Sequence, residues 1–508
     1  MTRQAGARSD RGTRHPHRQI VVAALTALAL LLLTACSSTG ENPPPLSSPT
    51  SSGLPTGSST TLTTGPASAP PTAAPAGTTP VGAKWDWARF DAYQPYLAGL
   101  KGGYTYYEFV WCDIEPTPGQ PDWSTIDQVV ERTKSLDMTL LLKIRVGMCA
   151  ATDGQPQFSR GANKTESGMP KNLGAYQAFI TAVVKRYAPQ GVTEFALENE
   201  VNSPSYWGGT PAQLKTLITA GAQAIRAGSP QAKVVDFGLS STTYGYGIAD
   251  RLLKAGNEQG AVDAWNSYNE RRIGTRGNKI PRVTSAADLQ AVLDSDQGRR
   301  NLTYLTMATD LARAKVVDVR QIHFYEKWSS VPDLMAYLAA STPPGTPIEA
   351  WEVGRFFRGS DTDDATTTGE VMQTMSGLLA SGVRVAIWLP LAVNPDGRNP
   401  DEPRFGLLDP SGSVRPAGQM ITDLATASRG ATAVPVSKGG LTGVGYDGAG
   451  GSVLFVWGAT APVTVPPGTK AAGPGQAPRP VSGTVDAATA PVQLRTDTSV
   501  SAILASQK

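Results

Sequence analysis

Cysteine, histidine and charge are all scarce in this 508-residue chain, and each scarcity narrows the range of functions. The three cysteines and three histidines show no ligand spacing, so we expect no structural metal site and no cofactor. Charged residues make up 17% of the chain, and the formal net charge is +3. Because five arginines lie within the first 18 residues, no basic stripe remains that would bind nucleic acid.

Long apolar runs are absent too, apart from one near the N-terminus. Segment 20–33 is apolar except for Thr26, which suits the core of a signal peptide better than a membrane span of about 20 residues. It follows a basic region and runs into Leu33-Thr34-Ala35-Cys36, which resembles a bacterial lipoprotein cleavage box. The resemblance implies a signal peptide over 1–36 and acylation of Cys36. We therefore expect an exported protein that only its lipid holds to the outer face of the cytoplasmic membrane.

The other two cysteines, Cys112 and Cys149, form an even pair in a chain that we expect to be exported. Disulfides persist in such compartments, and both residues lie just past neighbouring predicted strands. The pair is therefore a candidate disulfide. Two free, buried cysteines are the alternative.

Composition divides the rest of the chain into three parts. Residues 37–83 are mostly Ser, Thr, Pro, Gly and Ala with the single charge of Glu41, which predicts a disordered linker. Over 84–428, short apolar runs alternate with amphipathic helical stretches, as in repeated βα units. Beyond these residues the helical period disappears, and apolar runs such as 453–457 predict a small β-sandwich over 429–508.

The middle part contains eight candidate strands, namely 84–87, 104–111, 138–146, 193–197, 233–237, 318–324, 347–352 and 384–389. Helical patterns lie between them, with the clearest signals at 123–134, 173–187, 211–227 and 366–381. Eight βα units predict an α/β fold, a (β/α)8 TIM barrel with its largest insertion between the fifth and sixth strands. This insertion contains further helical patterns at 263–271, 286–293 and 299–314. The active site of such a barrel lies at the carboxyl ends of the strands, so carboxylates there are the first candidates.

Two glutamates occupy such positions. Glu200 follows Asn199 at the end of the fourth strand, and Glu352 ends the seventh. Glycosidic cleavage with retention needs two carboxyl groups about 5–5.5 Å apart, one to protonate the leaving oxygen and one to attack the anomeric carbon. Since all strand ends meet at one mouth of a barrel, Glu200 and Glu352 can meet there. Glu198 is expected to point away from the pocket.

These residues resemble glycoside hydrolase clan A, the retaining 4/7 superfamily, with barrels of the family 39 or family 5 type. The resemblance covers roughly residues 84–505, and it implies that Glu200 is the acid/base and Glu352 the nucleophile. It also implies that Asn199 contacts the 2-hydroxyl of the sugar and that Asn202 binds substrate. The clan's Trp-Asn-Glu-Pro reads Glu-Asn-Glu-Val here, which leaves the family and the substrate open.

Other strand ends supply further candidate substrate-binding residues. Trp111 opens a stretch that resembles the clan's loop after the second strand, and Arg145 ends the third strand, where it could orient a carboxylate or hydroxyl. The resemblance implies that His323 lines the subsite, that the hydroxyl of Tyr325 hydrogen-bonds the nucleophile, and that Trp388 forms a floor under the sugar. A buried structural role is the alternative for each.

The expected function is hydrolysis, by double displacement, of O-glycosidic bonds in an extracellular or envelope polysaccharide or oligosaccharide. The expected partner is thus a carbohydrate, and no feature indicates an oligomeric state. Two alternatives remain. One is a non-catalytic carbohydrate-binding surface lipoprotein, and the other is a transglycosylase that uses the same two carboxylates.

Overall fold

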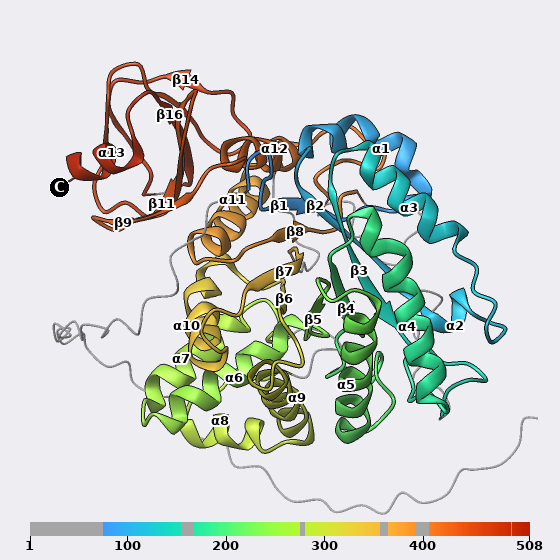
Figure 1. The fold of residues 1–508 in the computed structure, drawn as a ribbon. Helices are drawn as coiled ribbons and strands as arrows, with labels where there is room; N and C mark the ends of the chain where they lie inside the picture. The colour runs from blue at the N-terminus through green and yellow to red at the C-terminus, as the bar shows by residue number, and fades with distance from the viewer. Residues whose placement is uncertain are drawn as a thin grey trace, which may run out of the picture. The chain divides into compact units, whose positions relative to one another are not determined.

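The computed structural model describes residues 75–153, 166–274, 280–355, 364–392, 406–488 and 490–507. Eight parallel strands form one sheet in the order β5-β4-β3-β2-β1-β8-β7-β6. A bridge between Val235 and Val319 brings the two edge strands together and nearly closes the barrel (Figure 1). The predicted α/β barrel is therefore confirmed. The strands are β1 (Val81–Ala83), β2 (Tyr104–Val110), β3 (Thr139–Arg145), β4 (Glu194–Leu197), β5 (Lys233–Val235), β6 (Arg320–Phe324), β7 (Ile348–Val353) and β8 (Ala386–Trp388).

Helices cover the outside of this ring of strands (Figure 1). The α-helices of this region are α1 (Phe90–Leu97), α2 (Trp111–Ile114), α3 (Ser124–Ser135), α4 (Leu173–Tyr187), α5 (Pro211–Gly228), α6 (Ser241–Lys254), α7 (Glu258–Tyr268), α8 (Ala286–Leu293), α9 (Asp296–Arg313), α10 (Val331–Ser341), α11 (Asp364–Ala380) and α12 (Pro416–Ser428). Helix α5 begins where its sequence predicts, because Thr210 and Gln213 form a capping box around Pro211. No described helix is long and apolar enough to cross a membrane.

The first strand lies earlier than the sequence pattern predicts. We expected it at 84–87 after a linker that ends at 83, but Val81–Ala83 pairs with both β2 and β8. The following Asp86 instead caps a short 3-10 helix, Trp87–Arg89, by accepting from the Ala88 amide. A three-residue strand carries too little alternation to be recognised without its neighbours.

The inside of the barrel is packed by side chains that alternate along the strands. Its apolar layer consists of Tyr106, Leu141, Ala196, Val235, Val319, Trp351, Val385 and Ile387. Because successive side chains on a strand point to opposite faces, the next inward positions on β2 and β3 are Glu108 and Lys143. This apolar layer therefore lies directly beneath a charged one.

The insertion between β5 and β6 is helical and has its own small core. Helices α6 to α9 bury Tyr246 and Trp265, whose rings meet edge to face at 4.9 Å, together with Leu289 and Leu293. We predicted helices close to α7, α8 and α9, but not α6. That helix contains two glycines and two tyrosines, which are poor helix formers, so its packing against α7 and α9 stabilises it.

The C-terminal part is all β apart from one final helix, as expected for a sandwich. A six-stranded sheet has the order β14-β13-β16-β11-β10-β9, and β12 pairs with β15. Between them lies an apolar core that includes Val436, Leu454, Val456, Val463 and Leu494. The elements are β9 (Ala433–Lys438), β10 (Leu441–Gly448), β11 (Gly451–Trp457), β12 (Val463–Val465), β13 (Lys470–Ala472), β14 (Arg479–Pro480), β15 (Gly483–Val485), β16 (Val492–Thr496) and α13 (Val500–Ser506).

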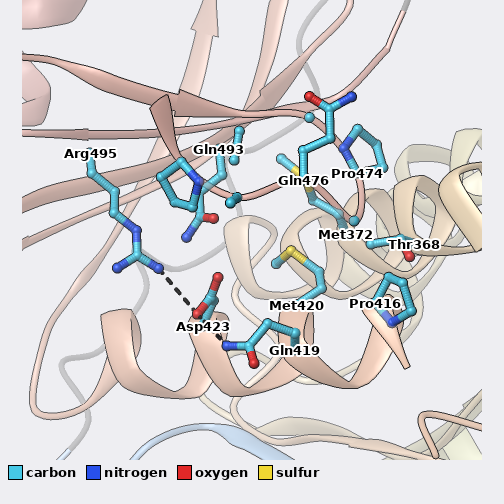
Figure 2. Close-up of a pocket in the computed structure, with 15 residues that line it drawn as sticks. Thr368, Met372, Pro416, Gln419, Met420, Asp423, Pro474, Gln476, Gln493 and Arg495 are labelled. Carbon is cyan, nitrogen blue, oxygen red and sulfur yellow. Dashed lines mark hydrogen bonds and ion pairs between the residues drawn. The ribbon is translucent and has the colours of Figure 1, made fainter. Parts of the chain in front are cut away.

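A groove of about 470 Å³ lies where α11 and α12 meet the six-stranded sheet (Figure 2). Met372 and Met420 form part of its lining, and an ion pair of 3.1 Å between Arg495 and Asp423 lies at one side. None of the lining residues belongs to the strand ends that carry Glu200 and Glu352. The groove is therefore separate from the candidate active site.

Candidate active site

Glu200 and Glu352 meet at the carboxyl ends of β4 and β7. One oxygen of each carboxylate and one ring nitrogen of His323 all lie within 4.8 Å of one another. Nδ1 of His323 lies 3.0 Å from Oε1 of Glu200 and 3.5 Å from Oε2 of Glu352. The imidazole is fully buried, whereas 16% of the Glu200 side chain remains exposed. Two acidic groups thus face one small space with a histidine between them.

A β-bulge aims Glu352 into this space. Along β7, Ala350 pairs with Ile322, but the next pair is Glu352 with His323, so Trp351 is one extra residue. Trp351 already points into the barrel, and strict alternation would turn Glu352 outward. The extra residue shifts the register, so Glu352 lies on the same side as His323. Bulges commonly reorient side chains in this way beside active sites.

The backbone around Glu200 is strained. Glu198 and Glu200 have φ angles of 69° and 43°, in the left-handed region that non-glycine residues rarely adopt. Glu198 is fully buried, and its Oε1 accepts a 2.7 Å hydrogen bond from the amide of Val146. Burial raises the pKa of Glu198 to about 7, although the charge of Arg145 and the Val146 bond lower it. The Glu198 carboxylate thus fastens the end of β4 to the end of β3.

Three hydrogen-bond donors surround the Glu352 carboxylate. The hydroxyl of Tyr325 donates to Oε2 at 2.9 Å, as the sequence resemblance implies. The hydroxyl of Tyr106 and the ammonium of Lys143 donate to Oε1 at 3.1 and 2.8 Å. Burial raises the pKa of both tyrosines well above the ordinary value, so both keep their protons. Glu352 is therefore held in one orientation by donors on three other strands or strand ends.

Electrostatics keep Glu352 ionised. Burial by itself raises the pKa of this carboxyl, but the positive charges of His323, Lys143 and Lys84 lower it more. The pKa of Glu352 therefore lies well below its ordinary value. A carboxylate that stays ionised at lower pH than an ordinary glutamate has the protonation state that a nucleophile needs.

Lys143 is the central residue that sequence reasoning missed. Its side chain is fully buried, and its ammonium donates to Oδ1 of Asn199 at 2.6 Å as well as to Glu352. The ammonium also lies 4.0 Å from Glu108 on β2. One signal was available, because Lys143 interrupts the apolar run of β3 two residues before Arg145, on the same face. A buried lysine in a strand interior needs an anion nearby.

Arg145 occupies the next inward position on β3. Its guanidinium is 2% exposed and lies 3.6 Å from Glu108, and it stacks 4.9 Å from the centre of the Tyr206 ring. Arg145 thus orients a carboxylate, one of the two roles expected for it. That carboxylate belongs to Glu108.

The glutamate pair with His323 is also the one group of potential metal ligands within the described part of the chain. However, the Lys143 ammonium already lies against Glu352, and its charge opposes that of a divalent cation. Charge balance at Glu352 therefore comes from the protein itself, and the donor set fits a carboxylate pair better than a metal centre.

Comparisons with known proteins identify the fold that carries this site. No family model matches the sequence, and no curated protein matches it. Among solved structures, a family 39 glycoside hydrolase from Bacteroides cellulosilyticus WH2 is similar to this chain, with a TM-score of 0.55 and a sequence identity of 15%. The match covers 82% of this chain and 81% of that one. This chain has the fold of the family 39 glycoside hydrolases. A family 39 β-xylosidase from Caulobacter crescentus is also similar, with a TM-score of 0.50 at 13% identity, over 85% and 98% of the two chains.

Three of the predicted substrate-binding residues, Trp111, Asn202 and Trp388, lie elsewhere in this family 39-like barrel. Trp111 is buried against Tyr176 and Phe179 of α4, and its indole donates to Glu115 at 2.9 Å. It therefore packs the barrel against its outer helices and does not reach the carboxylate pair. The reason is that Trp111 begins α2 directly after β2, which turns its side chain outward.

Asn202 holds the loop after β4 against the helical insertion through hydrogen bonds. Its amide nitrogen lies within 3.0 Å of the oxygens of Ser240, Thr243 and Asn301, and its oxygen accepts from the Ser240 amide. These partners belong to the helical insertion, so the side chain joins that insertion to the end of β4. Its hydrogen-bonding groups are all used within the protein.

Trp388 ends β8, as expected, and lies in register with Ala83 of β1 and Val353 of β7. Trp388, Ala83 and Val353 all belong to the apolar core outside the barrel, whereas Ile387 lines its inside. The expected floor under the sugar is therefore wrong, because strand alternation turns the Trp388 ring toward the outer helices.

Cys112 and Cys149 form a disulfide with a sulfur–sulfur distance of 2.10 Å and a Cα–Cα distance of 5.9 Å. The bridge joins the start of α2 to the loop after β3. Cys36 and the predicted signal peptide lie outside the described residues.

Proposed function

We propose that this protein is a retaining glycoside hydrolase, with Glu200 as the acid/base and Glu352 as the nucleophile. The observation that carries the proposal is the approach of the two carboxylates to within 4.8 Å. Retaining enzymes hold their carboxyl groups about 5–5.5 Å apart, whereas inverting enzymes leave about 6.5–9.5 Å for a water molecule. The spacing here favours direct attack by a carboxylate.

In the first step, ionised Glu352 attacks the anomeric carbon while protonated Glu200 donates its proton to the leaving oxygen. A covalent glycosyl ester forms on Glu352, and the aglycone departs. In the second step, Glu200, now a carboxylate, removes a proton from water, which attacks the anomeric carbon and releases the sugar. Retention follows because each step inverts the configuration once.

The surrounding residues support both steps. The donors Tyr325, Tyr106 and Lys143 hold the Glu352 oxygens in place, so little reorganisation is needed before attack. His323 lies against Glu200 at 3.0 Å and fixes the orientation of the acid. Asn199, next to Glu200 and held by Lys143, would contact the 2-hydroxyl of the sugar.

The decisive experiment is nucleophile rescue. Glu352→Ala should lower turnover of an aryl glycoside by on the order of 10⁴-fold or more. Added azide should restore it and give a glycosyl azide of inverted configuration. Glu131→Ala, which changes an exposed glutamate on α3, is the matched control and should retain full activity. Full activity of the Glu352 variant would overturn the assignment, and glycan binding without turnover in the natural protein would favour a binding role.

Export and lipid anchoring are part of the proposal. Cys36 follows a signal-peptide-like core, so the enzyme would act outside the cytoplasmic membrane on extracellular or envelope glycans. Metabolic labelling with a fatty acid should mark the natural protein and leave Cys36→Ser unlabelled. Equal labelling of both proteins would contradict acylation at this residue.

A further inference from the structure

The bulge that aims Glu352 is formed by Trp351, a large residue with a polar N–H group. The register shifts at this point against both neighbouring strands, between Ile322 and His323 on β6 and over 350–353 opposite β8. A bulge interrupts the hydrogen-bond ladder and bends the strand. The conformation of β7 at Trp351 therefore depends on the contacts that the Trp351 side chain makes.

The indole of Trp351 lies in the apolar layer inside the barrel. It is fully buried, and its ring stacks on that of Tyr106, with the ring centres 6.0 Å apart and the planes at 28°. The hydroxyl of Tyr106 donates to Oε1 of Glu352. Trp351 thus supports the nucleophile in two ways, through the strand that they share and through a tyrosine on β2.

Glu349 supplies the acceptor that the buried indole needs. Nε1 of Trp351 donates to Oε2 of Glu349 at 2.7 Å, and the Glu349 side chain is fully buried too. The two residues are two positions apart on β7, so alternation places both on the inside of the barrel. Buried donors are almost always paired, because the loss of water is otherwise uncompensated. This bond therefore fixes the orientation of the indole.

Arg384 balances the charge of Glu349. Its Nε donates to Oε1 of Glu349 at 2.7 Å, and its guanidinium also pairs with Glu194 at the start of β4. Burial raises the pKa of Glu194 to about 8, and the charge of Glu349 contributes, while Arg384 lowers it. Glu194 is thus largely protonated at neutral pH. The positive charge of Arg384 is left to neutralise Glu349, whose two oxygens each accept one hydrogen bond.

We propose that Glu349 is a positioning residue for the nucleophile and acts through the indole of Trp351. The contacts run from Arg384 through Glu349 to Trp351. The bulge at Trp351 then sets the direction of Glu352. Glu349 lies near the amino-terminal end of β7, so it acts without touching the substrate. This role rests on the proposed glycosidase function of the same site.

Two variants interrupt these contacts. In Glu349→Gln, only one oxygen remains, so either the indole or the guanidinium faces an NH2 group and loses its acceptor. Trp351→Phe keeps a ring inside the barrel but removes the N–H group. Small displacements of a reacting group are costly, so each variant should lower kcat by about 10- to 100-fold with KM unchanged. The acidic limb of kcat/KM should move to higher pH, because a displaced Glu352 loses part of its hydrogen bonds.

The assay uses the 4-nitrophenyl β-glycoside that the natural protein turns over best among the glucoside, galactoside, mannoside and xyloside. In the double variant, Glu349→Gln should lower kcat no further than Trp351→Phe alone, because the indole through which it acts is already gone. Glu115→Gln is the matched control. Glu115 accepts from the indole of Trp111 at 2.9 Å outside the barrel, so kcat and the pH profile should stay unchanged.

Each result decides between a positioning role and a structural one. Unchanged kcat and an unmoved acidic limb in folded Glu349→Gln would overturn the positioning role, even if the melting temperature decreases. Independent losses of kcat that multiply in the double variant would also overturn it. Circular dichroism reports folding, and if one single variant does not fold, the kcat and pH profile of the other decide. No turnover of any glycoside by the natural protein would instead count against the proposed function.

Discussion

Replacing Lys143 by methionine removes the ammonium that donates to both Glu352 and Asn199, at 2.8 and 2.6 Å. Methionine keeps most of the volume of the buried side chain, so the packing of β3 changes little. The hydroxyls of Tyr325 and Tyr106 still donate to Glu352. The perturbation is therefore the loss of one positive charge beside the nucleophile.

The magnitude follows from that single contact. A hydrogen bond to a charged partner contributes about 1.5–3 kcal/mol, and about 1.4 kcal/mol corresponds to one pH unit of pKa. Lys143 is one of three charges that lower the pKa of Glu352, with His323 and Lys84. In Lys143→Met, the pKa of Glu352 should therefore rise toward its ordinary value, and kcat/KM at acidic pH should decrease by about 10- to 100-fold. Ionised Glu352 is needed for attack, so activity should decrease first at acidic pH.

The assay is the pH dependence of kcat/KM, whose acidic limb reports the nucleophile in the free enzyme. That limb should move to higher pH in Lys143→Met and stay in place in Lys101→Met, a control at an exposed pair. Circular dichroism should show that both variants are folded. An unmoved acidic limb in a folded Lys143 variant would refute the electrostatic role assigned to this lysine.

Three further predictions concern stability. Folding raises the pKa of Glu198 from 4.5 to about 7. Its contribution to the free energy of unfolding is therefore full below about pH 4.5 and is lost as the pH rises through 7. Glu198→Gln should remove roughly 3 kcal/mol of this pH dependence, as measured by urea titrations across that range. The disulfide spans 37 residues, so Cys112→Ala with Cys149→Ala should lower the free energy of unfolding by about 4 kcal/mol, and an unchanged value would contradict the bridge. Asn202→Ala should cost about 1–3 kcal/mol of stability with KM unchanged, and a raised KM at full stability would indicate substrate contact instead.

Local signals allowed much of the fold to be predicted. The observed bounds of α4, Leu173–Tyr187, and α8, Ala286–Leu293, are those that periodicity predicts. The capping residues of α5 also lie within its own sequence. Helix α6 and strand β1 were missed or misplaced because neighbouring elements stabilise them. A three-residue strand such as Val81–Ala83 is defined by its pairing with β2 and β8, and a sequence window contains neither.

The residues of the candidate site also differ in how far the sequence predicted them. Glu200, Glu352, His323 and Tyr325 follow from strand ends and resemblance, because parallel strands of a barrel end at one mouth. Lys143 gave a faint signal as a lysine in an apolar strand. The surroundings of Trp111 gave none, because its indole packs on a helix more than 60 residues along the chain, at Tyr176 and Phe179.

By itself, the sequence determined most of the helices and strands and the acidic residues that end the fourth and seventh strands, since periodicity and strand order are properties of the chain. The tertiary structure alone decided where Glu352 points, through the bulge at Trp351, and which charges neutralise it. The physical reason is distance. Coulombic and hydrogen-bond energies depend on separations of a few ångströms between strands, and those separations exist only after β3, β6 and β7 have taken their places in the barrel.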